Sequence, residues 1–213
     1  MINSIWAPRQ YRKVQEITLG GRPAWRVPHY FNRPDLVLNF FRSRSAPLWK
    51  AEQRPSRNGL DFVDRRHNYS DRSMTDLDLL VNELTGQHAV KDHTLFTNWT
   101  RLLPNDYNMS RYRSHYWYPH RDTGYTAIIY FDTDRTNIYQ ELEPDPYHLE
   151  GRVEHDDPWR PKRYYQLLDQ VQGEINTLVI FDGTLIHGMA VEDPTNIFHT
   201  PRFNICQFYQ AAI

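Results

Sequence analysis

The feature that most constrains the fold is an H-x-D triplet, His120-Arg121-Asp122, placed just before an apolar run over residues 126–131. The run is rich in β-branched and aromatic residues, which predicts a buried strand. Side chains two positions apart on an extended chain project to one side, so His120 and Asp122 would present an imidazole and a carboxylate together. A second such triplet, residues 155–157, lies among polar residues and is predicted to be a solvated loop. Because a rigid strand positions ligands better than a loop, the first triplet is the candidate metal site.

A third ligand is expected from the C-terminal half of the chain. His187 follows the Asp182-Gly183 turn and lies between two apolar runs, a pattern typical of paired strands. Two imidazoles and one carboxylate that leave coordination positions open are typical of non-haem Fe(II) oxygenases. By itself, a histidine at a strand edge is more often a packed, hydrogen-bonded core residue. The competing histidines are His115, His148, His155 and His199.

Arg202 begins a predicted C-terminal strand, on which it shares one face with Asn204, Cys206 and Phe208. An arginine that faces a β-barrel interior is costly unless its charge is paired. No carboxylate that could pair with it is evident in the neighbouring sequence, and a ligand carboxylate bound through two hydrogen bonds would satisfy it. The alternative is an ion pair at the strand end or an outward-facing arginine.

Length and composition predict one domain, residues 1–213, in which residues 1–104 form an N-terminal hairpin with supporting helices and residues 105–213 form the catalytic core. The formal net charge of −1 provides no general attraction for nucleic acid or an anionic membrane. Cys206 is the only cysteine, so no internal disulfide forms. The first residues hold no apolar signal segment, and we expect a cytoplasmic protein with no membrane partner.

Local patterns predict the flanking elements. Residues 16–19 and 22–27 read as a hairpin around Gly20-Gly21. One helix is expected after Asn32 as the cap, and another from Thr75, also as a cap, to a stop at Gly86. Residues 43–73, which include the cluster Arg65-Arg66-His67, are expected to be irregular. That cluster reads as solvated surface, with a substrate or phosphate contact as the alternative. The polar segment 132–163 is predicted to be a long loop, either an active-site cover or a disordered insertion.

Over residues 112–209 the chain resembles the Fe(II)/2-oxoglutarate-dependent dioxygenases, and within them the prolyl-hydroxylase-like group. The H-x-D…H pattern of that family falls on His120, Asp122 and His187, which the resemblance implies are the catalytic metal ligands. Its late-strand arginine, which binds the distal carboxylate of 2-oxoglutarate, falls on Arg202. The further residues that the resemblance places around 2-oxoglutarate are Tyr112, Thr126, Tyr130 and Asn204.

The resemblance implies a mainly β fold with flanking α-helices, in which a double-stranded β-helix (a jelly-roll or cupin-like core) carries N-terminal supporting helices. It also implies Fe(II), 2-oxoglutarate and O2 as cofactor and cosubstrates, and hydroxylation of an unactivated C–H with release of succinate and CO2. Two features depart from the family pattern. The Gly-Gly-x-Leu that often follows the strand ending at Tyr130 is absent, and the interval from His187 to Arg202 is longer than in prolyl hydroxylases. A halogenase is not indicated, because Asp122 is a carboxylate.

The expected substrate is a protein side chain or a small molecule. Nucleic acid is the second choice within the oxygenases, because residues 42–66 are locally basic although the whole chain is not. Two alternative functions from outside the oxygenases remain. One is a cupin-like Zn or Mn enzyme that carries out hydrolysis or isomerisation, and the other is a non-catalytic jelly-roll binding module.

Overall fold

The computed structural model of the chain describes residues 8, 13–43, 50–52, 62–68, 74–89, 96–102, 106–146, 158–192 and 202–210. The described part is mainly β, with antiparallel sheets and few helices. The helices are α1 (Pro34–Ser43), α2 (Thr75–Thr85) and α3 (Asp106–Arg111), with one 3₁₀ turn at Lys162–Tyr164. The strands are β1 (Gln15–Leu19), β2 (Arg22–Val27), β3 (Lys50–Glu52), β4 (Phe62–Asn68), β5 (His88–Ala89), β6 (Phe96–Leu102), β7 (His115–Trp117), β8 (Tyr125–Tyr130), β9 (Arg135–Glu141), β10 (Trp159–Pro161), β11 (Tyr165–Gln172), β12 (Thr177–Asp182), β13 (Ile186–Met189) and β14 (Arg202–Gln210).

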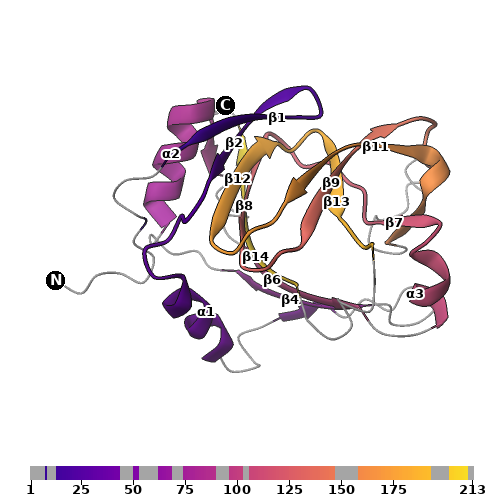
Figure 1. Cartoon of the computed structure of the whole chain (residues 1–213), viewed down its shortest axis with the longest axis horizontal. Helices are drawn as coiled ribbons and strands as arrows, with labels where there is room; N and C mark the ends of the chain where they lie inside the picture. Colours follow the sequence, from indigo (N-terminus) through magenta and orange to yellow (C-terminus); the bar gives the residue numbers. More distant parts are fainter. Residues whose placement is uncertain are drawn as a thin grey trace.

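One large sheet combines strands from both halves of the chain. Its order is β1-β2-β12-β8-β14-β6-β4-β3, and β5 also pairs with β14. A smaller sheet has the order β11-β9-β13, and β10 pairs with β7 as a separate ribbon. Figure 1 shows α1 and α2 at one end of the molecule and α3 at the other. The N-terminal strands are therefore part of the same sheet as the strands of the C-terminal half.

The two sheets enclose an apolar interior. Strand β8 lies between β12 and β14, and the register sets Ile128 opposite both Val179 and Cys206. Side chains at opposed positions project to the same face, so these three point to one side of the sheet. They pack against residues of the smaller sheet and its turns. The buried members of this interior cluster are Leu19, Ala24, Ile128, Tyr130, Ile138, Val171, Val179, Phe181, Leu185 and Cys206.

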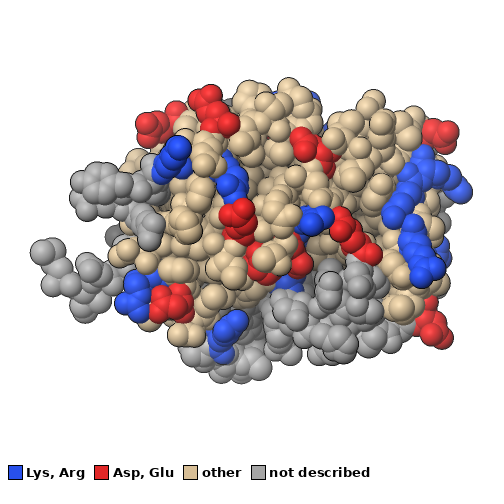
Figure 2. All heavy atoms as spheres, viewed as in Figure 1, with Lys and Arg blue, Asp and Glu red and all other residues tan. Residues whose placement is uncertain are grey.

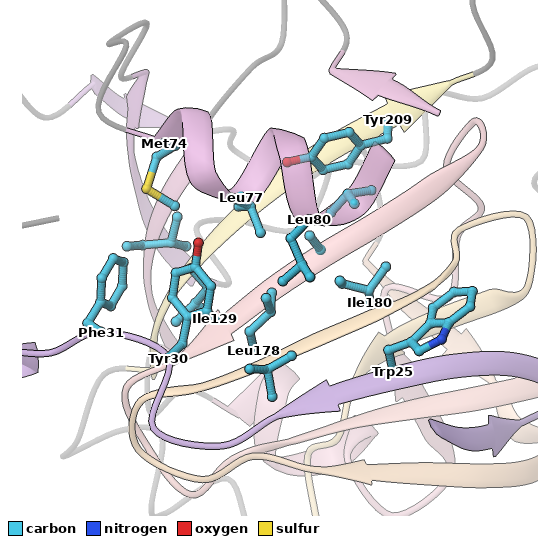
Figure 3. Packing of buried hydrophobic residues seen from close by; sticks show 14 of the residues in the cluster. Trp25, Tyr30, Phe31, Met74, Leu77, Leu80, Ile129, Leu178, Ile180 and Tyr209 are labelled. Atoms are coloured by element: carbon cyan, nitrogen blue, oxygen red, sulfur yellow. The ribbon is translucent and has the colours of Figure 1, made fainter. Parts of the chain in front are cut away.

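The opposite face of the large sheet packs against helices. Leu77 and Val81 of α2 lie one helical turn apart and are almost fully buried, as expected of an amphipathic helix on a sheet. Figure 3 shows α2 lying over strands that carry Ile129, Leu178 and Ile180. Each β-strand of this centre alternates between the helix-facing core and the interior cluster. Both faces of β8 and β12 are thus buried, which explains their nearly continuous apolar sequences.

The local predictions for the N-terminal half are largely confirmed. Strands β1 and β2 pair around Gly20-Gly21, both with positive φ. Helix α1 begins at Pro34, but the predicted cap at Asn32 is wrong, because the carbonyl of Arg33 accepts the first helical hydrogen bonds. Helix α2 ends at Gly86, whose φ is +71° and whose N–H donates to the Asn82 carbonyl at 2.7 Å. The predicted cap at Thr75 is wrong, because Thr75 is already helical and the cap position is Met74, which has no capping side-chain hydrogen bond.

Two segments predicted to be irregular contain strands. Within 43–73, β3 and β4 pair with each other, and β4 pairs with β6. Within 132–163, β9 pairs with both β11 and β13, and β10 pairs with β7. The polar side chains of β9 concealed the strand, although Thr136 and Asn137 are buried there with hydrogen-bond partners. The prediction of one long loop over 132–163 is therefore wrong.

The described helices are short. The longest, α2, has 11 residues, whereas a membrane-spanning helix needs about 20 predominantly apolar residues. No helix within the described ranges could therefore cross a membrane.

Candidate metal centre

Three side chains with metal-ligating atoms meet at one point: His120, Asp122 and His187. Their candidate ligand atoms all lie within 4.8 Å of one another. The Nε2 atom of His187 lies 3.2 Å from Asp122 Oδ2, and the Nε2 atom of His120 lies 3.8 Å from Asp122 Oδ1. Ligands about 2.1 Å from a metal ion lie about 3.0–3.4 Å apart in octahedral or tetrahedral geometry. The spacing therefore fits a single ion with small side-chain adjustments.

Main-chain hydrogen bonds position all three residues. His120 and His187 form a reciprocal pair, in which the N–H of each donates to the carbonyl of the other at 2.9 Å. His187 lies on β13, while His120 precedes β8 rather than lying within it. The N–H of Asp122 donates to the carbonyl of Gly183 at 2.8 Å, so the turn between β12 and β13 holds the carboxylate segment. The predicted relation of the H-x-D triplet to a buried strand is thus present, with the triplet just ahead of that strand.

Each imidazole has its Nδ1 atom occupied and its Nε2 atom directed to the common point. His120 Nδ1 lies 2.8 Å from the carbonyl oxygen of Tyr118, and His187 Nδ1 lies 2.8 Å from that of Leu185. A carbonyl only accepts hydrogen bonds, so Nδ1 carries the proton in each neutral ring and Nε2 keeps its lone pair. Metal-bound histidines are commonly oriented by this kind of second hydrogen bond. The arrangement is suited to ligation through both Nε2 atoms.

Asp122 is held in its ionised form. Burial raises the pKa of its carboxyl, but three effects outweigh burial and lower the pKa from 3.8 to about 2. They are the hydrogen bond with His187 and the charges of the two imidazoles, both of which require protonated rings, and the hydrogen bond from the Thr126 hydroxyl. Thr126 is buried and donates its hydroxyl to Asp122 Oδ2 at 2.7 Å. An anionic oxygen ligand therefore faces the two imidazole lone pairs at neutral pH.

Gly183 allows the turn between β12 and β13 to approach the carboxylate closely. A Cβ atom at this position would lie 2.5 Å from Thr126 Oγ1 and 2.9 Å from Asp122 Cβ. Both distances are shorter than non-bonded atoms tolerate. The Asp182-Gly183 pair, predicted only as a turn, thus has a second role in holding Asp122 and Thr126 together.

Arg202 is buried in the interior, as predicted, with only 6% of its surface exposed. Its Nη2 atom donates to Thr136 Oγ1 at 3.0 Å, and the Tyr130 hydroxyl lies 2.7 Å from the same oxygen. Its Nε atom has no hydrogen-bond partner. Within the described ranges no carboxylate forms an ion pair with it, although its charge lowers the pKa values of Asp132 and Asp134, which burial raises. This guanidinium retains unused donor capacity in a buried position.

The other residues that the resemblance places at 2-oxoglutarate have different contacts in the structure. Tyr130 lies beside Arg202, with the guanidinium carbon 5.8 Å from the centre of its ring, and burial raises the pKa of its hydroxyl to about 12. Thr126 contacts Asp122 instead. The Tyr112 hydroxyl accepts a hydrogen bond from Arg113 Nε at 2.9 Å, and its ring packs beside buried Trp117, Trp159 and Met189. Asn204 is buried and accepts a hydrogen bond from the Cys206 thiol.

Sequence reasoning missed Thr136, whose oxygen links Arg202 to Tyr130. Thr136 is buried on β9 together with Asn137, Ile138 and Tyr139, so the strand lacks the alternation of buried and exposed residues that could have revealed it. Among the competing histidines, His115 contacts Arg111 and Ser114 and does not join the centre. His148, His199 and the triplet 155–157 lie outside the described residues. Residues 65–67 belong to β4, and their side chains are also outside the described part.

No protein-family model matches the chain, and no curated protein matches it.

Proposed function

We propose that this chain is an Fe(II)- and 2-oxoglutarate-dependent oxygenase that hydroxylates an unactivated C–H. The observation that carries the proposal is the pairing of two features. Two imidazole Nε2 atoms and a carboxylate converge at one point, and a buried guanidinium with unused donors lies in the same β structure. A histidine or an arginine alone would be explained as a packed core residue, whereas the combination supports a metal centre with a bound carboxylate cosubstrate.

We also propose that the two sheets form a double-stranded β-helix, or jelly roll. The support is the antiparallel pairing throughout, the large sheet centred on β12-β8-β14, and the small β11-β9-β13 sheet that shares an apolar cluster with it. In such a core the metal ligands project from strands that flank the interior. The pairing of His187 with His120 across strand edges is compatible with this arrangement.

The types of donor match those of an iron oxygenase. Two imidazoles and one carboxylate with open positions are typical of non-haem Fe(II) oxygenases, whereas closed sets of four ligands are typical of structural zinc. Fe(II) and 2-oxoglutarate, when bound, supply the oxidation by O2, in which one oxygen atom enters the C–H bond of the substrate and the other enters succinate as CO2 leaves. The protein contributes binding, orientation and exclusion of water.

The residues around the candidate metal centre and Arg202 have distinct roles in this proposal. Arg202 would bind the distal carboxylate of 2-oxoglutarate, because a guanidinium offers paired donors to a carboxylate. Thr136 and Tyr130 hold that guanidinium in place. Thr126 orients the metal-binding carboxylate. The apolar side chains around Phe181, which packs edge-on to His187 at 5.0 Å between ring centres, keep water from the site.

The test is an anaerobic titration with Fe(II) and 2-oxoglutarate, followed by visible absorbance. The wild-type protein should develop a weak charge-transfer band that His187→Ala abolishes. Arg202→Gln should bind metal normally and require much more 2-oxoglutarate, while Arg33→Gln, an exposed arginine on the same chain, should behave as wild type. Absence of the band from wild-type protein would refute the proposal, and metal binding without any response to 2-oxoglutarate would favour the cupin-like hydrolase or isomerase.

We propose a protein side chain or a small molecule as the substrate. Nucleic acid is not favoured, because the chain has a net charge of −1 and general nucleic-acid binding depends on phosphate neutralisation by an excess of Lys and Arg. A screen of peptides, amino acids and nucleotides for succinate release would identify the class.

A further inference from the structure

Three cationic side chains near the C-terminal end of α3 each lie against a tyrosine ring. The distances from the cationic group to the ring centre are 5.5, 5.1 and 4.7 Å. The three pairs are Arg113 on Tyr112, Lys162 on Tyr116, and Arg163 on Tyr164. We call this set the cation–tyrosine surface. Contacts of this kind hold long side chains in defined positions.

The three cations come from two segments that the backbone joins. Strand β7 pairs with β10, and the N–H of Lys162 donates to the Ser114 carbonyl at 2.9 Å. Arg113 therefore lies one residue from this hydrogen bond on one segment, and Arg163 lies one residue from it on the other. Figure 2 shows Lys and Arg atoms gathered at the end of the molecule where α3 lies in Figure 1. The cations share one edge of the fold.

The three cations of this edge differ from other surface cations in lacking a direct ion pair within the described ranges. Arg22, Arg33 and Arg135 elsewhere form ion pairs with Asp182, Asp35 and Glu192. By contrast, no carboxylate in the described ranges forms an ion pair with a member of the cation–tyrosine surface. Glu143 is near enough for its charge to act on Arg163. In a protein whose total charge is −1, this is a local positive field suited to an anionic partner.

The tyrosine rings indicate which kind of anion fits. Proteins that bind single-stranded nucleic acid stack the bases on open aromatic faces. Here each ring already has a cation against it, and Tyr164 is only 9% exposed. Arg113 Nε and Arg163 Nη2 also donate to the hydroxyls of Tyr112 and Tyr164 at 2.9 and 2.6 Å. The surface thus offers oriented cations rather than stacking platforms, which suits carboxylates.

The cation–tyrosine surface adjoins the candidate metal centre. Tyr116 lies on β7, and the chain runs from it through Tyr118 to the ligand His120. Strand β7 ends at Trp117 and Tyr118 has a positive φ, so the four residues from Tyr116 to His120 cover at most about 13 Å, their fully extended length. A peptide in extended form would span that distance with about four residues or fewer. An anchored acidic segment would therefore bring side chains a few positions away to the metal.

We propose that the cation–tyrosine surface docks an acidic segment of a polypeptide substrate beside the metal centre. The assignment of that polypeptide as a substrate rests on the proposed oxygenase function, but the docking itself does not. Surface charge pairs are individually weak, so the segment needs several carboxylates that engage Arg113, Lys162 and Arg163 together. Binding should fall steeply with salt, because exposed charges are screened.

The test is fluorescence anisotropy on the full chain without added metal. The probes are a labelled peptide of alternating Glu and Gly, its Gln counterpart and a labelled oligothymidylate. The triple variant Arg113→Gln, Lys162→Gln, Arg163→Gln should bind the Glu peptide at least ten-fold more weakly than wild type. A matched triple variant, Lys13→Gln, Arg33→Gln, Arg42→Gln, removes the same charge from other exposed positions and should bind as wild type.

Three results would overturn the docking proposal: equal binding of the Glu and Gln peptides, unchanged binding by the first triple variant, or tighter binding of oligothymidylate through the same three cations. Circular dichroism of both triple variants checks that they fold. The charge-transfer band and succinate release with Fe(II) and 2-oxoglutarate then separate the two proposals. Charge-dependent peptide binding by a protein that gives no charge-transfer band with Fe(II) and 2-oxoglutarate would overturn the oxygenase function and leave docking intact. Succinate release that does not depend on peptide charge would overturn the docking proposal and leave the oxygenase function intact.

Discussion

Replacing Thr126 by valine removes one hydroxyl from beside the Asp122 carboxylate while keeping a β-branched side chain of similar size. In the wild-type protein that hydroxyl donates to Asp122 Oδ2 at 2.7 Å, and Thr126 is only 1% exposed. Water therefore has little access to replace the lost donor. The carboxylate would keep its charge but lose a contact that fixes its orientation toward His120 and His187.

The magnitude follows from two independent estimates. A hydrogen bond to a charged group contributes about 1.5–3 kcal/mol. Loss of a group that orients a metal ligand typically costs about 10–100-fold in metal affinity, which is about 1.4–2.8 kcal/mol. The Thr126 hydroxyl is the smallest of the contacts that lower the pKa of Asp122, after the burial that raises it. We therefore expect the lower end, a loss of about ten-fold in metal affinity.

The assay is competition for Zn²⁺ or Co²⁺ with a chromophoric chelator, using wild type, Thr126→Val and Thr126→Ser. Serine keeps the hydroxyl and should retain most of the affinity. The resemblance to prolyl hydroxylases instead assigns Thr126 to 2-oxoglutarate, and under that assignment the valine variant would bind metal normally and 2-oxoglutarate weakly. Equal metal affinity of Thr126→Val and wild type would refute the role that we derive from the structure.

Three other substitutions test the surrounding structure. Gly183→Ala should lower both metal affinity and melting temperature, because the added Cβ would lie 2.9 Å from Asp122 Cβ; an alanine variant with wild-type metal affinity would contradict this. Burial raises the pKa of the Asp78 carboxyl in the folded state, so folding favours its protonated form. The contribution of Asp78 to stability should therefore be greatest below the pKa of the unfolded state, and it should be lost as pH rises through the pKa of the folded state. Asp78→Asn should flatten that dependence in urea denaturation between about pH 4 and 7, and an identical pH profile would argue against it. Asp145→Asn should cost about 3–5 kcal/mol of unfolding free energy by disturbing the buried ion pair with Arg160, whereas a loss below about 1 kcal/mol in the same assay would show that the pair is replaceable.

The elements that sequence reasoning found are those in which local pattern and tertiary role agree. Gly20-Gly21 needs positive φ at both residues, which glycine adopts at low cost, and the strands on either side follow. The apolar runs of β8 and β12 match their burial on both faces. His120, Asp122 and His187 were predicted as a group because their residue types suit one metal, and the structure brings them together.

The errors arose where tertiary contacts override composition. Strand β9 reads as polar, but Asn137 donates to the Tyr139 hydroxyl and accepts from Gln170. A buried polar group with partners costs little, and sequence alone does not reveal those partners because Gln170 is distant along the chain. The hydrogen bond from Thr126 to Asp122 was likewise not evident from the sequence, and the assignment of Thr126 to 2-oxoglutarate stays a prediction. Which hydroxyl reaches Asp122 depends on the turn at Gly183, which sequence pattern does not specify.

The reciprocal backbone pair of His120 and His187 bears on which metal the protein acquires. Since main-chain bonds already hold both imidazoles, folding itself assembles the coordination sphere and an incoming ion need not organise it. A preassembled set of nitrogen and oxygen donors ranks divalent first-row ions by their intrinsic order of affinity, with copper and zinc above iron. The ion found in protein purified from cells would then reflect the supply in the growth medium, and loading with iron would require the exclusion of those competitors.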